Sequence, residues 1–169
     1  IKALKNENDP TLLVLPADHI IKNQEKFLEV ISTALVHVDK GKLVTLGIIP
    51  DRAETGFGYI EASKTLNMNV LKGEKIKRFI EKPNKKVAEN LILDKRFSWN
   101  SGMFLFKANA LIEEVKKFKP EIFKLCEQSL KGSVLDLDFQ RIDNKYFSLS
   151  ENISIDKAIM EKTQRGMVL

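Results

Sequence analysis

The chain has almost no cysteine. Cys126 is the only one among its 169 residues, so an intrachain disulfide bond is excluded. A protein without disulfides fits the reducing environment of the cytoplasm, and we therefore expect a cytoplasmic protein. Apolar residues surround Cys126 in the sequence, which predicts a buried, unreactive thiol on a helix rather than a catalytic nucleophile.

Long hydrophobic runs and several catalytic signatures are also missing. No apolar run approaches the ~20 residues that a membrane-spanning helix needs, so we expect no membrane partner. Residues 1–10 lack the apolar core of a secretory signal. The sequence contains no G-x-S-x-G nucleophile elbow, and its histidines and cysteine do not have the spacing of a metal-ligand set.

The positive charge of the chain is not clustered. The net charge is +5, from 28 basic and 23 acidic residues that alternate along the sequence. Only residues 82–86 and 116–119 are locally basic. Nucleic-acid-binding proteins usually gather basic residues on one face, so we expect no nucleic-acid partner. A surplus of lysine instead suits a protein that handles phosphorylated, anionic small molecules.

The remaining composition is that of an ordinary globular protein, with 43% hydrophobic and 30% charged residues. The length favours a single domain over residues 1–169. Strand-like and helix-like segments alternate, which predicts the α/β class with a mixed, mostly parallel sheet flanked by helices. The expected strands are residues 12–15, 43–49, 59–62, 76–81, 103–106 and 167–169. The expected helices are residues 24–38, 84–93, 109–119, 121–130 and 154–161.

Local signals support the first of these elements. Asn23 and Asn109 are the expected N-caps of two helices, and Gly41 is the expected stop of the helix that Asn23 begins. Residues 12–49 then form a strand, a helix and a second strand, which is typical of a right-handed βαβ unit.

The most informative segment is residues 12–19, where an aliphatic run ends at Pro16 and is followed by Asp18 and His19. A continuous aliphatic run bounded by proline predicts a strand buried on both faces of a parallel sheet. Ligands of open α/β sheets bind beyond the carboxyl ends of such strands, so Asp18 is a candidate for contact with a divalent cation or a phosphorylated substrate. Asp18 can equally cap the following turn, and a ligand role and a turn role both stay open for His19.

Two further segments combine glycines or an amide with a strand. The loop at residues 51–58 contains Gly56 and Gly58, whose missing side chains let a ligand approach the backbone. A glycine-rich hairpin turn explains the same pair. Asn100 precedes an apolar strand and offers both donors and acceptors for a hydroxyl group, or it belongs to a structural turn.

Glu81 and Lys82 follow the apolar strand at residues 76–81. The carboxylate can accept hydrogen bonds from sugar hydroxyls, and the ammonium can neutralise a phosphate as a point charge. A solvated ion pair of little energetic value is the alternative. Pro83 predicts extended backbone geometry at Lys82.

The order of these segments resembles that of the bacterial mannose-1-phosphate guanylyltransferases, the GDP-mannose pyrophosphorylase family, including the form fused to phosphomannose isomerase. The resemblance rests on residues 13–19, 54–61, 79–83, 99–104 and 154–163 and spans nearly the whole chain. It implies a Rossmann-like nucleotide-diphospho-sugar transferase fold. It also implies a reaction of GTP with mannose-1-phosphate that gives GDP-mannose and pyrophosphate, with Mg²⁺ as cofactor.

The resemblance also implies roles for single residues. Asp18 would be a Mg²⁺ ligand, and Lys82 would hold the phosphate of the sugar phosphate; these two are the expected catalytic residues. Asp156 resembles a carboxylate near the site, although a helix-capping role is as plausible for it.

Four further residues would bind the sugar. By the resemblance, Gly58 and Tyr59 would line the sugar pocket, while Glu81 and Asn100 would bind mannose hydroxyls. The expected chemistry is mainly positioning and charge neutralisation, because the phosphate nucleophile is already an anion.

The sequence also departs from the family pattern. The glycine-rich segment that grips the triphosphate in this family, and the family's second metal-binding Asp, have no counterpart among residues 1–169. Phe57 replaces a usual Tyr, and Lys157 replaces another usual Tyr. The chain lacks an initiator Met and stops within an expected strand. We therefore expect a fragment, truncated at both ends, that does not turn over by itself. A sheet without its first strand has an open edge, which predicts a homo-oligomer.

Two other functions stay open at this point. A non-catalytic pyrophosphorylase-like module, used for binding or regulation, keeps the fold and lacks the phosphate-gripping segment. A nucleotidyltransferase for glucose-1-phosphate or another sugar phosphate shares most of the same motifs.

Overall fold

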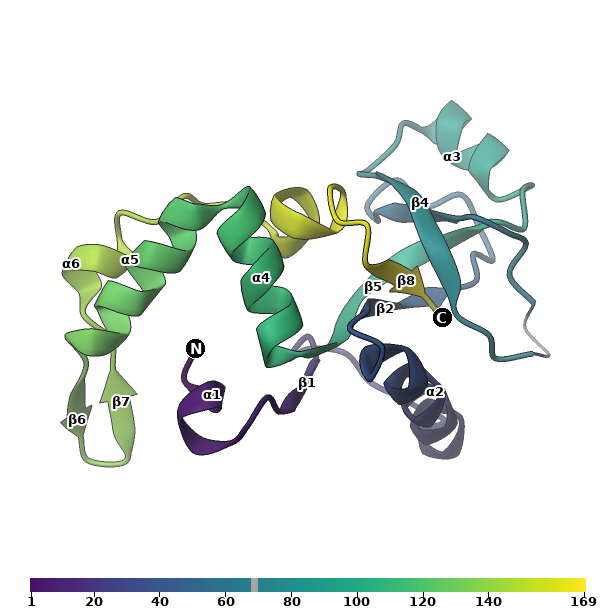
Figure 1. Cartoon of the computed structure of the whole chain (residues 1–169). Coiled ribbons are helices and arrows are strands. Elements are labelled where there is room, and N and C mark those ends of the chain that lie inside the picture. Colours follow the sequence, from purple (N-terminus) through teal and green to yellow (C-terminus); the bar gives the residue numbers. More distant parts are fainter. Residues whose placement is uncertain (68–69) are drawn as a thin grey trace. The chain divides into compact units, whose positions relative to one another are not determined.

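The computed structural model describes residues 1–67 and 70–169, with the backbone alone at residue 6 (Figure 1). Contacts divide the chain into two compact units, and each unit is built from separate stretches of sequence. Unit 1 consists of Ile1–Pro10 and Ala108–Thr163, and unit 2 of Thr11–Lys107 and Gln164–Leu169. A single domain over residues 1–169 stays a prediction.

Unit 2 contains a six-stranded mixed sheet with the strand order β1-β5-β2-β8-β4-β3. Its strands are β1 (Thr11–Val14), β2 (Leu43–Ile48), β3 (Tyr59–Ala62), β4 (Glu74–Ile80), β5 (Phe97–Lys107) and β8 (Gly166–Val168). β3 also pairs with β5, so the pairings of β5, β2, β8, β4 and β3 form a closed ring. The predicted α/β class with a mixed sheet is confirmed.

The sheet is less parallel than predicted. β2 and β8 are the one parallel pair among the strands of residues 11–67 and 70–169, and every other pair in this sheet is antiparallel. The physical reason is the insertion of β5 between β1 and β2. The two strands of the expected βαβ unit therefore run in the same direction without being neighbours.

The prediction that the first strand is buried on both faces is wrong. β1 pairs with β5 in antiparallel register, from Thr11 opposite Lys107 to Val14 opposite Phe104. Leu13 and Val14 are exposed. The reason is position, because β1 lies at the edge of the described sheet, and an aliphatic run does not reveal whether a layer packs over it.

Helices cover the sheet of unit 2 where the sequence predicts them. α2 (Gln24–Val38) begins at Asn23, whose side chain accepts a hydrogen bond from the Lys26 amide at 2.9 Å. Gly41, with a φ of 70°, follows the end of this helix, so both expected helix signals are confirmed. α3 (Lys85–Leu91) begins at Asn84, and its Ala88 and Leu91 pack with apolar side chains of β3 and β5.

Unit 1 is mainly helical. Its elements are α1 (Ala3–Asn6), α4 (Ala108–Phe118), α5 (Pro120–Lys131), β6 (Val134–Asp136), β7 (Phe139–Arg141), α6 (Asn144–Phe147) and the π-helix η1 (Asp156–Met160). The hairpin of β6 and β7 and the helix α6 were not expected, because three-residue strands and a one-turn helix are too short for a clear periodic pattern. Cys126 lies on α5 as predicted but is only half-buried.

The expectation that Asn109 caps a helix is wrong. The helix α4 already contains Asn109, and the Asp9 carboxylate accepts a hydrogen bond from the Asn109 amide at 2.8 Å. Asp9 has a φ of 59°, a left-handed conformation that aspartate tolerates better than most residues. The cap thus comes from a residue far away in the sequence. No helix of the described residues is long and apolar enough to span a bilayer.

Candidate functional site

Three of the predicted sugar-binding residues converge at one place in unit 2. A Cβ added at Gly58 would lie 3.0 Å from Oε2 of Glu81 and 3.6 Å from Cβ of Asn100. The backbone amide of Asn100 donates a 2.8 Å hydrogen bond to the Gly58 carbonyl. Gly58 directly precedes β3, Glu81 directly follows β4, and Asn100 lies in β5. Residues in or next to three different strands therefore place a backbone segment, a carboxylate and an asparagine side chain close together.

A local irregularity in β5 orients Asn100. Thr45 of β2 lies opposite Phe104, but Gly47 lies opposite Asn100, so β5 carries extra residues between these pairs. Within this bulge, Gly102 has a φ of 70°, which glycine adopts without strain. The Asn100 side-chain oxygen accepts hydrogen bonds from the Gly102 amide at 3.2 Å and from Oγ1 of Thr45 at 3.3 Å. These two donors fix the orientation of the Asn100 side-chain amide.

Tyr59 supports the loop before Gly58 from the protein core. Its side chain is 0% exposed and packs with Ala88 and Leu91 of α3. Its hydroxyl donates to the Glu54 carbonyl at 2.9 Å and accepts from the Glu54 amide at 3.0 Å. The sequence predicted Tyr59 in the lining of a sugar pocket. In the described structure its ring faces the core, and its contacts hold the loop in place.

The loop itself is braced by a carboxylate and by aromatic contacts. Glu54 accepts a hydrogen bond from the Gly56 amide at 3.0 Å, and this backbone contact lowers the pKa of Glu54. The ring of Phe57 meets the ring of Trp99 edge-on, with 5.3 Å between centroids. The Arg52 guanidinium lies 5.2 Å from the Trp99 ring. The loop therefore has a defined conformation in spite of its glycines.

Lys82 has an unexpected backbone conformation. Its φ is 41°, so the prediction of extended geometry before Pro83 is wrong. The chain turns sharply between the end of β4 and the N-cap of α3 at Asn84, and this turn outweighs the local preference. A left-handed lysine costs about 1–2 kcal/mol, and such strain is often found at functional sites. Its ammonium lies 3.7 Å from Oε1 of Glu81, with both side chains exposed.

Asp18 lies in a turn after β1 and is exposed. Two residues before it, Pro16 has a side-chain carbon 3.6 Å from the Cβ position of Gly102. The segment that carries Asp18 thus passes beside the bulge of β5 that carries Asn100. In residues 1–67 and 70–169, no hydrogen bond or ion pair occupies the Asp18 carboxylate, so it fits a cation ligand. Mg²⁺ is commonly held by one or two carboxylates together with substrate phosphates. Across the same residues there is no cluster of three or more His, Cys, Asp or Glu side chains that could cage a metal.

Asp156 belongs to unit 1, whereas the other predicted site residues belong to unit 2. It is the first residue of η1 in unit 1, where its carbonyl accepts a hydrogen bond from the Glu161 amide at 2.9 Å. Gly58, Glu81, Lys82, Asn100 and Asp18 all belong to unit 2. A role for Asp156 at their site therefore stays a prediction.

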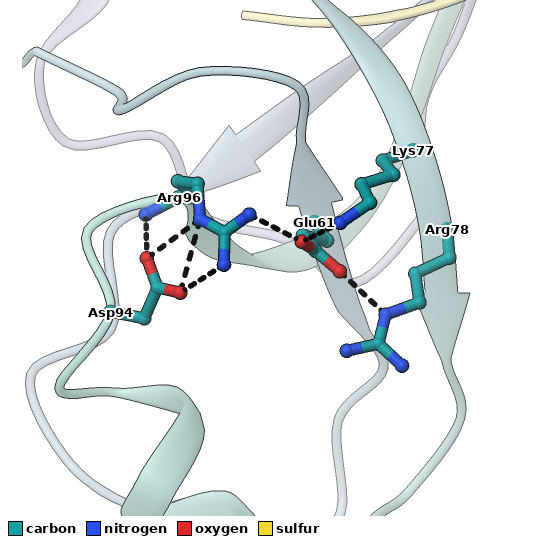
Figure 2. Close-up of polar contacts among 5 residues, drawn as sticks. All are labelled: Glu61, Lys77, Arg78, Asp94 and Arg96. Carbon is teal, nitrogen blue, oxygen red and sulfur yellow. Dashed lines mark hydrogen bonds and ion pairs between the residues drawn. The ribbon is translucent and has the colours of Figure 1, made fainter.

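A buried charge cluster that the sequence analysis missed lies on the same three strands (Figure 2). Glu61 of β3 is 1% exposed and accepts hydrogen bonds from Lys77 at 2.9 Å and from Arg78 at 2.5 Å. Arg96, directly before β5, lies 2.8 Å from Glu61 and also binds Asp94. A glutamate within an otherwise apolar strand was the available signal, because a buried charge must be paired.

A β-bulge explains how two successive residues reach the same carboxylate. Glu61 lies opposite Arg78 and Ala62 lies opposite Ile76, so Lys77 is an additional residue in β4. Such a bulge sets two residues of one strand against one of the next and re-aims their side chains. Burial alone would raise the pKa of Glu61, but the hydrogen bonds and charges of Lys77 and Arg78 outweigh it and lower that pKa. Hydrogen bonds from Arg96 likewise lower the pKa of Asp94.

A cavity of about 430 Å³ lies elsewhere in unit 2 and contains none of the predicted site residues. It is lined by Ile49, Pro50, Thr65, Leu66, Asn67, Ile92, Asp94, Lys95 and Phe97. Three of the predicted residues, Asp18, Glu81 and Lys82, are exposed instead.

Residues 1–150 match the family model described as nucleotidyl transferase, so the chain belongs to the nucleotidyl transferase family. Two relatives are more specific. The chain is similar to the xanthan biosynthesis protein XanB of Xanthomonas campestris pv. campestris (strain B100), with 40% identity over 169 residues, which is all of the chain and 35% of that protein. It is 43% identical over 162 residues to the mannose-1-phosphate guanylyltransferase ManC of Salmonella typhimurium, covering 95% of the chain and 34% of that protein.

Solved structures agree with this assignment. The mannose-6-phosphate isomerase of Helicobacter pylori matches with a TM-score of 0.85 and 34% identity, over 99% of the chain and 64% of that structure. A structure titled mannose-1-phosphate geranyltransferase, from Thermus thermophilus, matches with a TM-score of 0.82 and 32% identity, over 99% of the chain and 46% of that structure. The resemblance inferred from the sequence motifs is confirmed. The chain spans about a third of the length of the curated relatives it matches.

Proposed function

We propose that this chain provides the sugar-phosphate-binding part of an enzyme that forms GDP-mannose and pyrophosphate from GTP and mannose-1-phosphate. The names of its relatives support the reaction, since several are mannose-1-phosphate guanylyltransferases. The observation that carries the proposal is the convergence of Gly58, Glu81 and Asn100, which sets a carboxylate and an amide-bearing residue beside the same stretch of backbone.

In this proposal Glu81 and Asn100 bind hydroxyl groups of the mannose. A carboxylate accepts hydrogen bonds from two hydroxyls, and an amide both donates and accepts. The glycine at position 58 lets the carboxylate of Glu81 lie against the backbone, because any side chain there would meet Oε2 of Glu81. Tyr59 acts indirectly, as a positioning residue that holds the loop through both backbone groups of Glu54.

Lys82 binds the phosphate of mannose-1-phosphate. Its ammonium is exposed and lies beside Glu81, so it can move from the carboxylate to a bound phosphate without crossing a barrier of packed atoms. An oxygen of the sugar phosphate then attacks the α-phosphorus of GTP, and the bond from that phosphorus to the bridging oxygen breaks as pyrophosphate leaves. The attacking oxygen is already anionic, so the residues of this chain orient and neutralise rather than remove a proton.

Asp18 is the residue proposed to hold Mg²⁺, the cofactor expected from the family. A magnesium ion at this site would neutralise the phosphate oxygens at the reacting centre. Asp156 is proposed as a second carboxylate near the site.

A free cysteine and the absence of disulfides support a cytoplasmic location, and the open edge of β1 supports a homo-oligomer.

The proposal is tested on the full-length protein with GTP, Mg²⁺ and mannose-1-phosphate, by following pyrophosphate release. We expect steady turnover with this pair, slower turnover with glucose-1-phosphate or ATP, and no turnover for residues 1–169 alone. A preference for glucose-1-phosphate would change the substrate assignment. Binding of mannose-1-phosphate without any turnover of the full-length protein would indicate a non-catalytic binding or regulatory module instead.

Substitutions then test the assigned residues. Glu81→Gln and Asn100→Ala are expected to raise the KM for mannose-1-phosphate at least tenfold. Lys85→Gln is the matched control, because Lys85 is exposed at the start of α3 and forms no part of the proposed site. Equal effects of all three substitutions would contradict the assignment.

A further inference from the structure

Two buried hydroxyl groups lie where the register between β2 and β5 shifts. Thr45 is 0% exposed and Ser101 is 5% exposed. Between the pairs Thr45–Phe104 and Gly47–Asn100, β2 has one residue and β5 has three. The extra residues interrupt the ladder of backbone hydrogen bonds, so buried backbone groups in this stretch need other partners.

The two hydroxyl groups supply those partners. Oγ of Ser101 donates to the Leu46 carbonyl at 2.5 Å and accepts from the Met103 amide at 3.2 Å. Oγ1 of Thr45 donates to the Met103 carbonyl at 3.1 Å. Side chains thus bind three backbone groups of the bulge. The bulge is therefore a built feature of the sheet and not a local defect.

Thr45 also contacts the candidate site. Its Oγ1 lies 3.3 Å from Oδ1 of Asn100, and the same Oδ1 accepts a hydrogen bond from the Gly102 amide at 3.2 Å. Because a backbone N–H only donates, the Gly102 contact identifies this atom of Asn100 as the oxygen. The single hydroxyl proton of Thr45 is then shared between the Met103 carbonyl and the Asn100 oxygen.

A hydroxyl group at position 45 is not explained by strand formation. Threonine and valine have similar shapes, and both suit a β-strand. Burial of a hydroxyl group costs free energy unless it is hydrogen-bonded, whereas burial of a methyl group is stabilising. At a position that is 0% exposed, valine would be the simpler choice. The two acceptors of Thr45 account for the hydroxyl group.

We propose that Thr45 is a positioning residue of the sugar-phosphate site. Its hydroxyl group holds the side-chain oxygen of Asn100, and the direction of that amide is therefore set before a ligand arrives. A fully buried side chain does not touch a ligand itself, so Thr45 acts through Asn100, which is only half-buried. A side chain that is already ordered loses less conformational freedom on binding. Thr45 has this role only if Asn100 contacts the sugar, so the proposal rests on the proposed function.

Kinetics of the full-length protein with GTP and mannose-1-phosphate test the proposal. Thr45→Val removes the hydroxyl group and keeps the shape of the side chain. We expect the KM for mannose-1-phosphate to rise about fivefold, which is the effect of one neutral hydrogen bond. The kcat should be unchanged, because the lost interaction acts on binding. Thr45→Ser keeps the hydroxyl group and should restore most of the affinity.

Thr33→Val is the matched control. Thr33 of α2 donates its hydroxyl group to the Glu29 carbonyl at 3.0 Å, so the same substitution removes one hydrogen bond at a residue that forms no part of the candidate site. The KM of this variant should stay at the value of the parent protein.

A double-mutant cycle with Asn100→Ala separates positioning from a purely structural role. If Thr45 acts through Asn100, Thr45→Val should not raise the KM of the Asn100→Ala variant any further. The melting temperature should fall by the same amount in both backgrounds, because the hydrogen bond to the Met103 carbonyl is lost in each. A purely structural role of Thr45 would instead change the KM equally in both backgrounds.

Three results would overturn the proposal. If Thr45→Val raises the KM by the same factor with and without Asn100, Thr45 acts through the backbone of the bulge. If Asn100→Ala raises the KM and Thr45→Val does not, Thr45 has no part in binding, and the proposed function still stands. If Asn100→Ala itself leaves the KM unchanged, the proposed sugar contact is wrong, and the positioning role of Thr45 is wrong with it.

Discussion

A methyl group added at Gly58 would lie 3.0 Å from Oε2 of Glu81. Gly58→Ala is therefore expected to push the carboxylate aside and to weaken binding of mannose-1-phosphate about tenfold or more, since a hydrogen bond to a charged group contributes about 1.5–3 kcal/mol. Gly58 does not need a positive φ, so the effect comes from space alone. Isothermal titration gives the affinity, and thermal unfolding shows whether stability is retained.

Gly56 in the same loop is the control for this substitution. The nearest atom to its added Cβ would be Oε1 of Glu54 at 3.4 Å, the far end of a flexible side chain. Gly56→Ala should therefore leave ligand affinity within about twofold, by the usual tolerance of exposed loop positions. If both alanine variants bind equally well, Gly58 does not line the site.

At single residues, the sequence indicated which residues lie together better than it indicated their conformation. The family resemblance implied that Gly58, Glu81 and Asn100 lie at one sugar site, and the structure brings these three together. The φ of 41° at Lys82 was not predictable, because the turn between β4 and α3 imposes it against the local effect of Pro83. The burial of the Tyr59 ring also depends on α3, which packs over it from later in the sequence.

The helix α4 is capped by a residue that is distant in the sequence, and not by Asn109 as expected from its own segment. Asp9→Ala removes the carboxylate that accepts from the Asn109 amide, and it places alanine in a left-handed conformation. We expect a loss of about 1–2 kcal/mol in the free energy of unfolding, measured by urea denaturation. Asp9→Asn retains both an acceptor and a tolerance of this conformation, so it should recover most of the loss.

The cap expected from the sequence provides the counter-test. Asn109→Ala should change the free energy of unfolding by no more than about 0.5 kcal/mol, as is usual for surface positions without a special contact. If Asn109→Ala lowers the free energy of unfolding more than Asp9→Ala does, the side chain of Asn109 is the cap and Asp9 is not.

The buried Glu61 of β3 binds two residues of β4 and one residue next to β5. Replacing Glu61 should therefore change how the stability of the folded chain depends on pH. The pKa of Glu61 is lowered in the folded chain, whereas an unfolded glutamate titrates near pH 4.3. The stability contributed by the ionised group is therefore complete above about pH 5, and it is lost as the pH falls below 4.3 and through the folded pKa. Glu61→Gln should cost about 1.5–3 kcal/mol at neutral pH. It should also flatten the acid side of the stability curve.

Glu29→Gln is the matched control for Glu61→Gln. Glu29 pairs with Lys26 at 2.8 Å, but both side chains are exposed. Exposed pairs contribute about 0–1 kcal/mol, so this variant should follow the parent chain at every pH. Urea denaturation between pH 3 and 7 distinguishes the two carboxylates, and parallel acid limbs for all three proteins would contradict a structural role for Glu61.

Elements with local signals were predicted closely, and elements held by distant partners were not. The helix α2 has its cap at Asn23 and its stop at Gly41 within the segment itself, and its predicted bounds agree with the structure. The first strand was assigned to the right residues but to the wrong environment, because its neighbour β5 lies about 90 residues later. The Glu61 cluster depends on the bulge at Lys77, which only the pairing of β3 with β4 reveals.

In the whole molecule, β8 closes the ring of strands, because it pairs with both β2 and β4. Val168 is fully buried and packs with Ile60 and Ala62 of β3. Val168→Ala should destabilise unit 2 by about 2 kcal/mol through the cavity it leaves. Val36→Ala, on the exposed side of α2, should change stability by no more than about 0.5 kcal/mol.

Amide hydrogen exchange identifies the elements that Val168→Ala destabilises. Faster exchange in β2, β4 and β5 with unchanged exchange in α5 would show that the two units open independently. Equal acceleration in α5 would show that they unfold as one cooperative body. No acceleration in β2 or β4 would contradict the role given to β8.

The position of β8 in the ring of strands has a consequence for biosynthesis. β2 and β4 are complete once residue 80 has left the ribosome, yet the strand that lies between them ends at residue 168. During the translation of the intervening residues, the nascent chain must keep two unsatisfied strand edges apart from each other and from other polypeptides. Long-range pairing of this kind slows folding and exposes intermediates to aggregation. The yield of native protein should therefore depend on chaperones and on translation rate more than the modest size of the chain suggests.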